Sequence, residues 1–183
     1  MAKNILIACE FSGRVRDAFK TRGWNAWSCD ILPTDKPGNH IQQSVLPLLL
    51  MPWDMLIAFP PCTYLCSSGA RWWKDKQVEQ AEAIQFFMLL ATCHIPKICI
   101  ENPVGVMSTK WRKPDQTIQP WMFGHGETKR TCLWLKNLPL LQPTNIVSGR
   151  EARVHNLPPS VNRSKLRSLT YTGVAAAMVE QWG

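Results

Sequence analysis

The chain has 183 residues, 45% of them hydrophobic and 19% charged, which is typical of one soluble globular domain. No apolar run is long enough to span a membrane and no signal peptide is recognisable, so we expect a cytoplasmic protein whose seven cysteines stay reduced. The formal net charge of +8 favours a polyanionic partner such as nucleic acid, although a basic surface can also serve solubility alone.

The N-terminal segment has the pattern of a Rossmann-like unit. Residues 4–9 form an apolar run typical of a buried strand, and residues 14–22 have apolar positions at helical spacing. Ser12 is the expected N-cap of this helix. Gly13 would let a ligand approach free N–H groups at the helix start, although many such turns contain a glycine and bind nothing.

A second expected strand, residues 25–29, ends at Asp30. An acid at this tip commonly accepts from a ribose hydroxyl, but it can equally cap the turn that follows. We expect a loop over residues 32–40, a short edge strand over 41–45, and a short helix or turn over 46–53.

The next strand, residues 55–59, ends at two prolines and a cysteine. Pro60 and Pro61 cannot donate to a sheet ladder and both hold φ near about −65°. They form a rigid turn that presents Cys62 where the strand ends, which is where reactive groups lie in open α/β sheets. Cys62 is therefore a candidate nucleophile, and the alternative is an idle thiol behind a strand terminator.

Two further segments follow the cysteine. Residues 71–74 mix Arg71 and Lys74 with two tryptophans, a combination that either binds bases and phosphates or packs over the core. Residues 78–92 predict a helix with one apolar stripe, which we interpret as core. The stripe consists of Val78, Ala81, Ile84, Phe87, Met88 and Ala91.

Residues 97–100 predict another buried strand, with the polar tip Glu101-Asn102-Pro103. If this strand lies beside the one that ends at Cys62, its acid can act on a ring nitrogen next to a thiolate. The alternative for Glu101 is a solvated or helix-capping acid.

The C-terminal half predicts a hairpin, a long loop and a last helix. Residues 117–123 and 129–135 are the expected hairpin strands, with His125 as a turn residue between them. Residues 139–162 are proline-rich and predict an extended loop that is too short for a second domain, so residues 1–183 are expected to form one domain. A final helix is expected over residues 171–182.

The order of these tips resembles the cytosine-5 DNA methyltransferase family, and looks closest to its short phage or prophage members. A glycine turn, an acid, Pro-Pro-Cys, Glu-Asn and a basic hairpin strand follow one another, and the helix after Thr170 looks like the closing segment beside the cofactor turn. The matching segments are Phe11-Ser12-Gly13, Asp30, Pro60-Pro61-Cys62, Glu101-Asn102 and Lys129-Arg130.

The resemblance implies a Rossmann-like, S-adenosylmethionine-dependent methyltransferase fold, an α/β fold with a mostly parallel sheet and an antiparallel hairpin at its edge. It implies methylation of carbon 5 of cytosine in DNA, in a bacterial host cell, through a covalent adduct of Cys62. The implied catalytic residues are Cys62, Glu101, Asn102 and Arg130. The implied cofactor contacts are Glu10, Phe11, Ser12, Gly13, Asp30, Ile31 and Pro60, and the implied DNA contacts are Pro61, Arg71, Lys129, Arg130 and Arg153.

The chain also departs from the family. Where the family has an adenine-binding Asp, this sequence has Gln42-Gln43-Ser44, and its basic motif is Thr128-Lys129-Arg130. It has no large target-recognition domain, so we expect little sequence choice, a partner that supplies it, or a substrate other than duplex DNA. Two alternatives remain: methylation of a free cytosine nucleotide, and a non-catalytic DNA-binding relative.

Two alternative assignments, an amino-methyltransferase and a zinc site, are disfavoured. Amino-methyltransferases need a polar residue before Pro-Pro, and Phe59 in that position can accept no hydrogen bond. Cys66 lies four residues after Cys62, but the four ligands of a zinc site are lacking, so we expect no metal.

Overall fold

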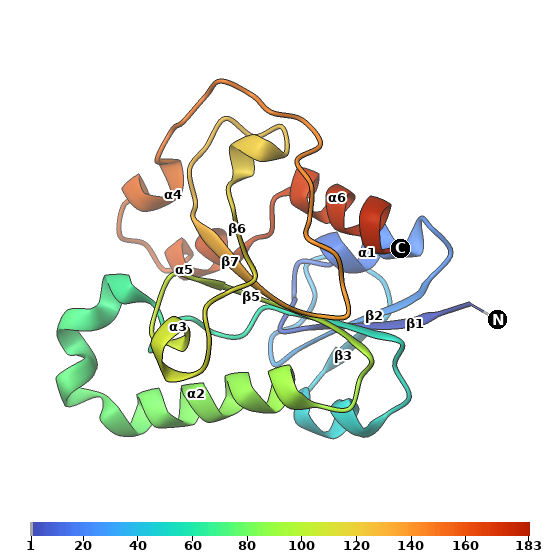
Figure 1. Ribbon diagram of the computed structural model, residues 1–183, viewed down its shortest axis with the longest axis horizontal. Coiled ribbons are helices and arrows are strands. Elements are labelled where there is room, and N and C mark those ends of the chain that lie inside the picture. Colours follow the sequence, from blue (N-terminus) through green and yellow to red (C-terminus); the bar gives the residue numbers. More distant parts are fainter. Residues whose placement is uncertain (1) are drawn as a thin grey trace.

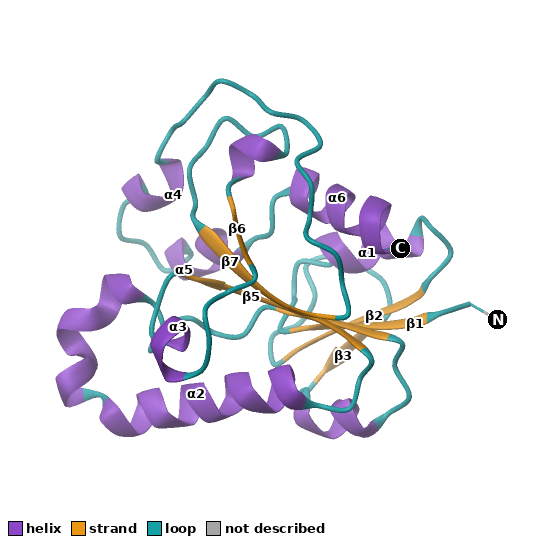
Figure 2. Cartoon of the chain, viewed as in Figure 1, coloured by secondary structure: helices purple, strands orange, loops and turns teal. Residues whose placement is uncertain are grey.

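The computed structural model describes residues 2–183, which form a seven-stranded sheet with helices on both faces (Figures 1 and 2). The strands are β1 (Asn4–Ala8), β2 (Asn25–Asp30), β3 (His40–Gln42), β4 (Met55–Ala58), β5 (Lys97–Pro103), β6 (Gln116–Ile118) and β7 (Thr131–Lys136). Their order is β3-β2-β1-β4-β5-β7-β6. The strands from β3 to β5 pair in parallel, and β7 and β6 add an antiparallel edge, which confirms the predicted fold class.

The helices form two layers. The α-helices are α1 (Arg14–Lys20), α2 (Gln77–Thr92), α3 (Met107–Lys110), α4 (Arg153–Asn156), α5 (Arg163–Ser168) and α6 (Thr172–Trp182), and the 3-10 helices are η1 (Leu46–Leu50), η2 (Ser67–Asp75) and η3 (Pro120–Met122). Figure 1 shows α1 and α6 on one side of the sheet and α2 on the other. Among the described residues, no helix is both long and apolar enough to cross a membrane.

The central strands are apolar on both faces because both faces are covered. In β1, Ile5 and Ile7 pack into the cluster that contains α1 and α6, whereas Leu6 and Ala8 pack into the cluster that contains η1 and α2. All four are fully buried. β1 ends one residue before the predicted Cys9, because Cys9 adopts a left-handed φ of 57° that turns the chain out of the sheet.

Three other expectations need correction. Val78 is 70% exposed and Ala81 is exposed as well, because a helical stripe does not reveal where the core beneath the helix ends. The hairpin strands are shorter than expected, since Pro120 starts the turn η3 in place of a longer β6. The segment 139–162, expected to be an extended loop, contains the one-turn helix α4.

Candidate active site

The strand register brings Cys62 and Glu101 to the same end of the sheet. Ala58 of β4 lies opposite both Ala8 of β1 and Ile100 of β5. The next residues along β4 and β5 are Phe59 and Glu101, and both line one pocket. The prediction that the Pro-Pro-Cys and Glu-Asn tips belong to adjacent strands is therefore confirmed.

A side-chain hydrogen bond of Asn102 joins the tips of β4 and β5. Its side-chain nitrogen donates to the carbonyl of Pro60 at 2.8 Å, and the residue is only 2% exposed. The Pro60 carbonyl belongs to the turn that carries Cys62, so this bond holds the turn against β5. Because the bond is buried, losing it would leave a carbonyl without a partner.

The loop after Cys62 is compact. The carbonyl of Cys62 accepts from the N–H groups of Leu65 and Cys66 at 3.0 and 2.9 Å. The loop is also tied to the segment after β5, because the N–H of Val106 donates to the Leu65 carbonyl at 2.8 Å. Gly105 permits this approach, since a Cβ on it would meet the Leu65 carbonyl oxygen. The nucleophile loop thus rests on both β5 and the chain that leaves it.

Cys62 is exposed, yet its surroundings hold it as a thiol. Partial desolvation raises the pKa of Cys62, and Cys66 and Glu101 raise it further. The charges of Lys129 and Arg167 lower it. A thiolate at this position therefore depends on these two cations.

Glu101 is half-buried and lines this pocket, whereas Cys62 lies outside the lining and feels the charge of Glu101. Burial raises the pKa of Glu101, while Lys129 opposes the rise. A raised pKa favours the protonated carboxyl, which can donate a hydrogen bond to a ring nitrogen. Besides Phe59 and Glu101, the pocket is lined by residues that include Lys129, Thr170, Tyr171 and Met178, so α6 supplies part of its wall.

The turn over residues 10–13 is buried by the chain's own groups. The carboxylate of Glu10 accepts from the N–H groups of Val15 at 2.7 Å and Arg16 at 3.2 Å. Gly13, with φ of 69°, is the N-cap residue in place of the expected Ser12, although the Ser12 hydroxyl accepts from the Arg14 N–H at 3.3 Å. The expectation of free N–H groups at the start of α1 was therefore wrong, because Glu10 and Ser12 already satisfy them.

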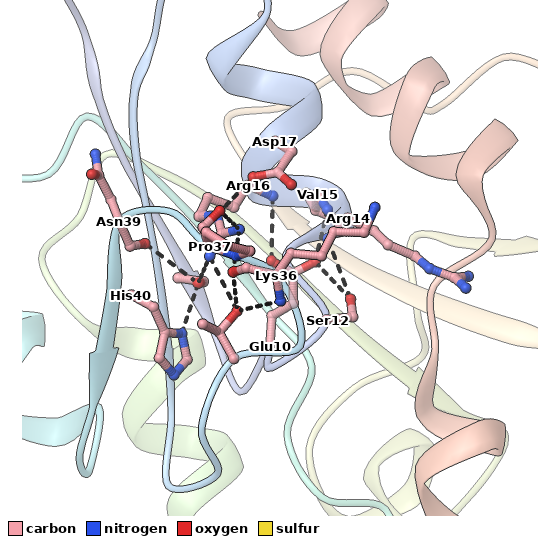
Figure 3. Close-up of polar contacts among 12 residues, drawn as sticks. Glu10, Ser12, Arg14, Val15, Arg16, Asp17, Lys36, Pro37, Asn39 and His40 are labelled. Carbon is pink, nitrogen blue, oxygen red and sulfur yellow. Dashed lines mark hydrogen bonds and ion pairs between the residues drawn. The ribbon is translucent and has the colours of Figure 1, made fainter.

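Arg16 occupies the space beside Gly13. Its side chain is fully buried, and a Cβ on Gly13 or Gly38 would collide with its guanidinium. Its ion pair with Asp17 is 2.8 Å long. Figure 3 shows the polar contacts of Arg16 with the loop after β2. The guanidinium also donates to Ser28, Thr34 and the carbonyls of Lys36 and Pro37. Arg16 thus binds the loop after β2 to the turn after β1.

The residues expected to contact DNA lie at several different places around the site. Lys129 lines the pocket with Glu101, but Arg130 is exposed and its charge acts on Cys132. Arg153 forms a 2.9 Å ion pair with Glu127. Arg71 lies in η2, and Pro61 is exposed next to Cys62.

Sequence reasoning missed the contacts that hold α6. The Tyr171 hydroxyl donates to Glu127 at 2.6 Å, and the Gly173 N–H donates to His125 Nε2 at 3.0 Å. His125 is thus an acceptor for the start of α6 as well as a turn residue. Arg167 in α5 was also missed as a charge that acts on Cys62. No motif signalled these residues, because each acts across a long sequence separation.

Comparison with known proteins supports the fold. No family model matches the chain, and no curated protein is similar enough to match it. A solved structure of a DNA modification methyltransferase, described as putative and encoded within an E. coli prophage, has a TM-score of 0.54 at 14% identity and covers 87% of this chain and 56% of its own. The chain has a Rossmann-like fold that it shares with this solved methyltransferase.

A second solved methyltransferase, a mutant of Spodoptera frugiperda DNMT2, matches less closely. Its TM-score is 0.46 at 15% identity, over 82% of this chain and 54% of its own. The chain therefore spans about half the length of both of these solved structures. The prophage structure shows the fold, and it agrees with the resemblance of the motifs.

A methyltransferase fold implies S-adenosylmethionine, and two parts of the site fit it differently. At the tip of β2, Ile31 is 74% exposed and Asp30 is half-buried, so an apolar side chain and a carboxylate are available for a nucleoside. One Asp30 oxygen also accepts from the Leu32 N–H at 2.9 Å, so the turn-capping alternative is observed. Residues 10–13 fit poorly, because a ligand there must displace the cover that Arg16 and its neighbours form.

Proposed function

We propose that the chain is an S-adenosylmethionine-dependent methyltransferase that methylates carbon 5 of cytosine in DNA through Cys62. The observation that carries this proposal is the clamp between Asn102 and Pro60, which fixes an exposed thiol next to a carboxyl whose pKa is raised. A strand terminator with an idle thiol needs neither the clamp nor the acid. The likeness of the fold to that of a solved methyltransferase supports this interpretation of the thiol and the carboxyl.

The chemistry uses both groups. Carbon 5 of cytosine is a weak nucleophile, and a thiolate that adds to carbon 6 makes it an enamine carbon that can attack a methyl group. Cys62 forms the sulfur–carbon bond while Glu101, as the protonated acid, donates its hydrogen to ring nitrogen 3 and so offsets the charge that addition creates. After methylation, solvent water takes the proton from carbon 5, and the electrons of that bond form the ring double bond again as the sulfur–carbon bond breaks. Ring nitrogen 3 returns its proton to Glu101, which regenerates the acid and the Cys62 thiolate.

S-adenosylmethionine would supply the electrophilic methyl group. In this proposal Asp30 and Ile31 hold its nucleoside, which their exposure at the tip of β2 supports, and Phe59 and Met178 contribute apolar wall to the pocket that Glu101 lines. The net charge of +8 favours a polymer of phosphates over a single nucleotide. The target cytosine must leave a duplex stack, or arrive single-stranded, to reach the thiol.

The test is transfer of a labelled methyl group to separate samples of DNA, RNA and dCMP, followed by digestion and identification of the labelled base. We expect 5-methylcytosine from DNA. Cys62→Ser should abolish the label, whereas Cys93→Ser, a half-buried cysteine at the end of α2, should keep it. Label on DNA that persists in Cys62→Ser at the wild-type rate would overturn the role of the thiol. Label on dCMP alone would favour the nucleotide alternative.

A second function is favoured by the closed turn over residues 10–13. A non-catalytic DNA-binding relative would keep the fold and the basic charge but would not need room for a methyl donor. In that case DNA binding, measured as a mobility shift, would persist without transfer to any cytosine substrate. It would also be unaffected by S-adenosylmethionine.

A further inference from the structure

The positive charge of the chain is concentrated in one stretch, residues 121–170. This stretch contains eight lysines and arginines and only two acids, Glu127 and Glu151, so it carries a formal charge of +6 out of the +8 of the whole chain. Charge that serves solubility alone has no reason to gather in one stretch. The concentration therefore points to a polyanionic partner that meets this part of the molecule.

Within this stretch, residues 145–151 form an ordered arm. Backbone hydrogen bonds of 2.7 to 3.2 Å join the arm along its length to residues 121–128, the segment that precedes Lys129 and β7. Figure 1 shows the arm running alongside that segment beyond the end of the sheet. A part of the chain that has little regular secondary structure is thus held in one place.

Arg150 is fixed near the end of this arm. Its guanidinium carbon lies 3.9 Å from the centre of the Trp121 ring, and its Nη1 donates to the carbonyls of Val147 and Gly149 at 2.6 Å each. Arg150 is nevertheless exposed, and no acceptor among the described residues bonds to its Nε or Nη2. A guanidinium that is held in place and has unused donors is prepared for an anion, because it has little rotamer freedom left to lose on binding.

The arm is joined directly to the wall of the pocket that Glu101 lines. The carbonyl of Glu151, the residue after Arg150, accepts from the N–H of Thr128 at 2.8 Å. The residue after Thr128 is Lys129, which lines that pocket. A polymer that places one base in the pocket therefore has its backbone within reach of the arm.

We propose that the arm is a docking surface for DNA, on which Arg150 binds a backbone phosphate next to the nucleotide that enters the pocket. This inference rests on the proposed function for the kind of polymer, and it adds the surface that holds the polymer. Trp121 supports the guanidinium from below and is not itself a base-stacking residue, because Arg150 covers its ring. A phosphate contact carries no base specificity, so the arm binds DNA of any sequence.

The experiment measures DNA binding without cofactor. The full chain is titrated into a fluorescently labelled duplex DNA, and anisotropy gives the dissociation constant at a series of salt concentrations. Loss of one phosphate contact should reduce the slope of log affinity against log salt concentration by about 0.9. We expect this reduction in Arg150→Ala, together with roughly eightfold weaker binding at about 0.1 M salt, and we expect it equally for two unrelated DNA sequences.

Three further variants make the result specific. Arg22→Ala removes the same charge from an exposed position just after α1, where the chain returns to the start of β2, and should keep the wild-type slope. Arg150→Lys keeps the charge but loses the planar fork, so it should keep the slope and weaken binding by less than Arg150→Ala. Arg150→Gln replaces Arg150→Ala if circular dichroism shows that the latter does not fold.

A wild-type slope in a folded Arg150→Ala or Arg150→Gln would overturn the inference, and so would an equal reduction in Arg22→Ala. Binding of the wild type to RNA or to polyglutamate, but not to duplex DNA, would overturn it as well. Methyl transfer plays no part in this measurement. A chain that binds DNA through Arg150 but methylates nothing would contradict the proposed function alone, and an active methyltransferase whose slope does not depend on Arg150 would contradict this inference alone.

Discussion

The two halves of the candidate site are built in opposite ways. At the tips of β4 and β5, Cys62 is exposed and one buried bond, from Asn102 to Pro60, sets its place. At the tips of β1 and β2, residues 10–13 are buried and Arg16 occupies the space that Gly13 leaves. The thiol side is open to a substrate, whereas the turn on the cofactor side is filled with internal hydrogen bonds.

This contrast shows that a glycine turn is not by itself a ligand site. The same features that admit a ligand, a left-handed glycine and a helix start, here admit an arginine and a glutamate from the chain. Glu10 gains two N–H donors and Arg16 gains partners from the loop after β2, so each buried charge has polar partners of its own. Lys165 of α5 then lies over this turn, because its ammonium is paired with Asp35 and lies above the Phe11 ring.

The largest expected effect comes from removing Arg16, which fills the space beside the turn over residues 10–13. Arg16→Ala should lower the free energy of unfolding by roughly 4 kcal/mol, because it empties a fully buried site and leaves the oxygens that accept from the guanidinium without a donor. Urea denaturation followed by circular dichroism measures it. Arg22→Ala, at an exposed position just after α1, should change stability by less than about 0.5 kcal/mol. Equal losses in both variants would contradict the picture of a filled turn.

The next largest effect concerns the packing of the loop after Cys62 against the segment that follows β5. Gly105→Ala should cost roughly 3 kcal/mol, because the new methyl group collides with the Leu65 carbonyl and pushes the nucleophile loop away from β5. Gly69→Ala is the matched control, since a Cβ there meets only ordinary contact at 3.5 Å. Differential scanning calorimetry of both variants compares them directly. Similar transition temperatures for the two would show that the loop yields without cost.

Asn102→Ala tests the clamp. It should cost roughly 2 kcal/mol, since the buried Pro60 carbonyl loses its donor. Amide hydrogen exchange should also quicken at Leu65 and Cys66, whose N–H groups depend on the same turn. Unchanged exchange in residues 62–67 would mean that the prolines alone hold the thiol.

Much of the fold can be predicted from the sequence, because apolar runs mark the buried strands and prolines mark their ends. Fewer of the contacts in the candidate site can be predicted in this way. Lys129 and Arg130 are neighbours that precede β7, and which of them faces the pocket depends on the conformation of the irregular segment before that strand, for which the sequence has no pattern. Arg16 has the pattern of a solvated cation on a helix, and only the loop from residue 34 to 38 buries it. These contacts join distant segments, so local pattern cannot reveal them.

The smallest expected effect is a gain in stability from Glu101→Gln. Burial raises the pKa of Glu101, so the folded chain binds a proton more tightly than the unfolded chain, and stability falls as pH rises from the unfolded pKa through the folded one. A neutral amide avoids this loss, so we expect Glu101→Gln to be about 1 kcal/mol more stable than the wild type at neutral pH and equal to it in acid. The lost attraction to Lys129 reduces the gain but should not reverse it, because burial is the larger cause. Urea titrations at neutral and acidic pH measure the difference, and methyl transfer should be lost in the same variant. A variant that is less stable than the wild type at neutral pH would show that Glu101 is held as a carboxylate, and a donor of a proton to cytosine would then have to be sought elsewhere in the pocket.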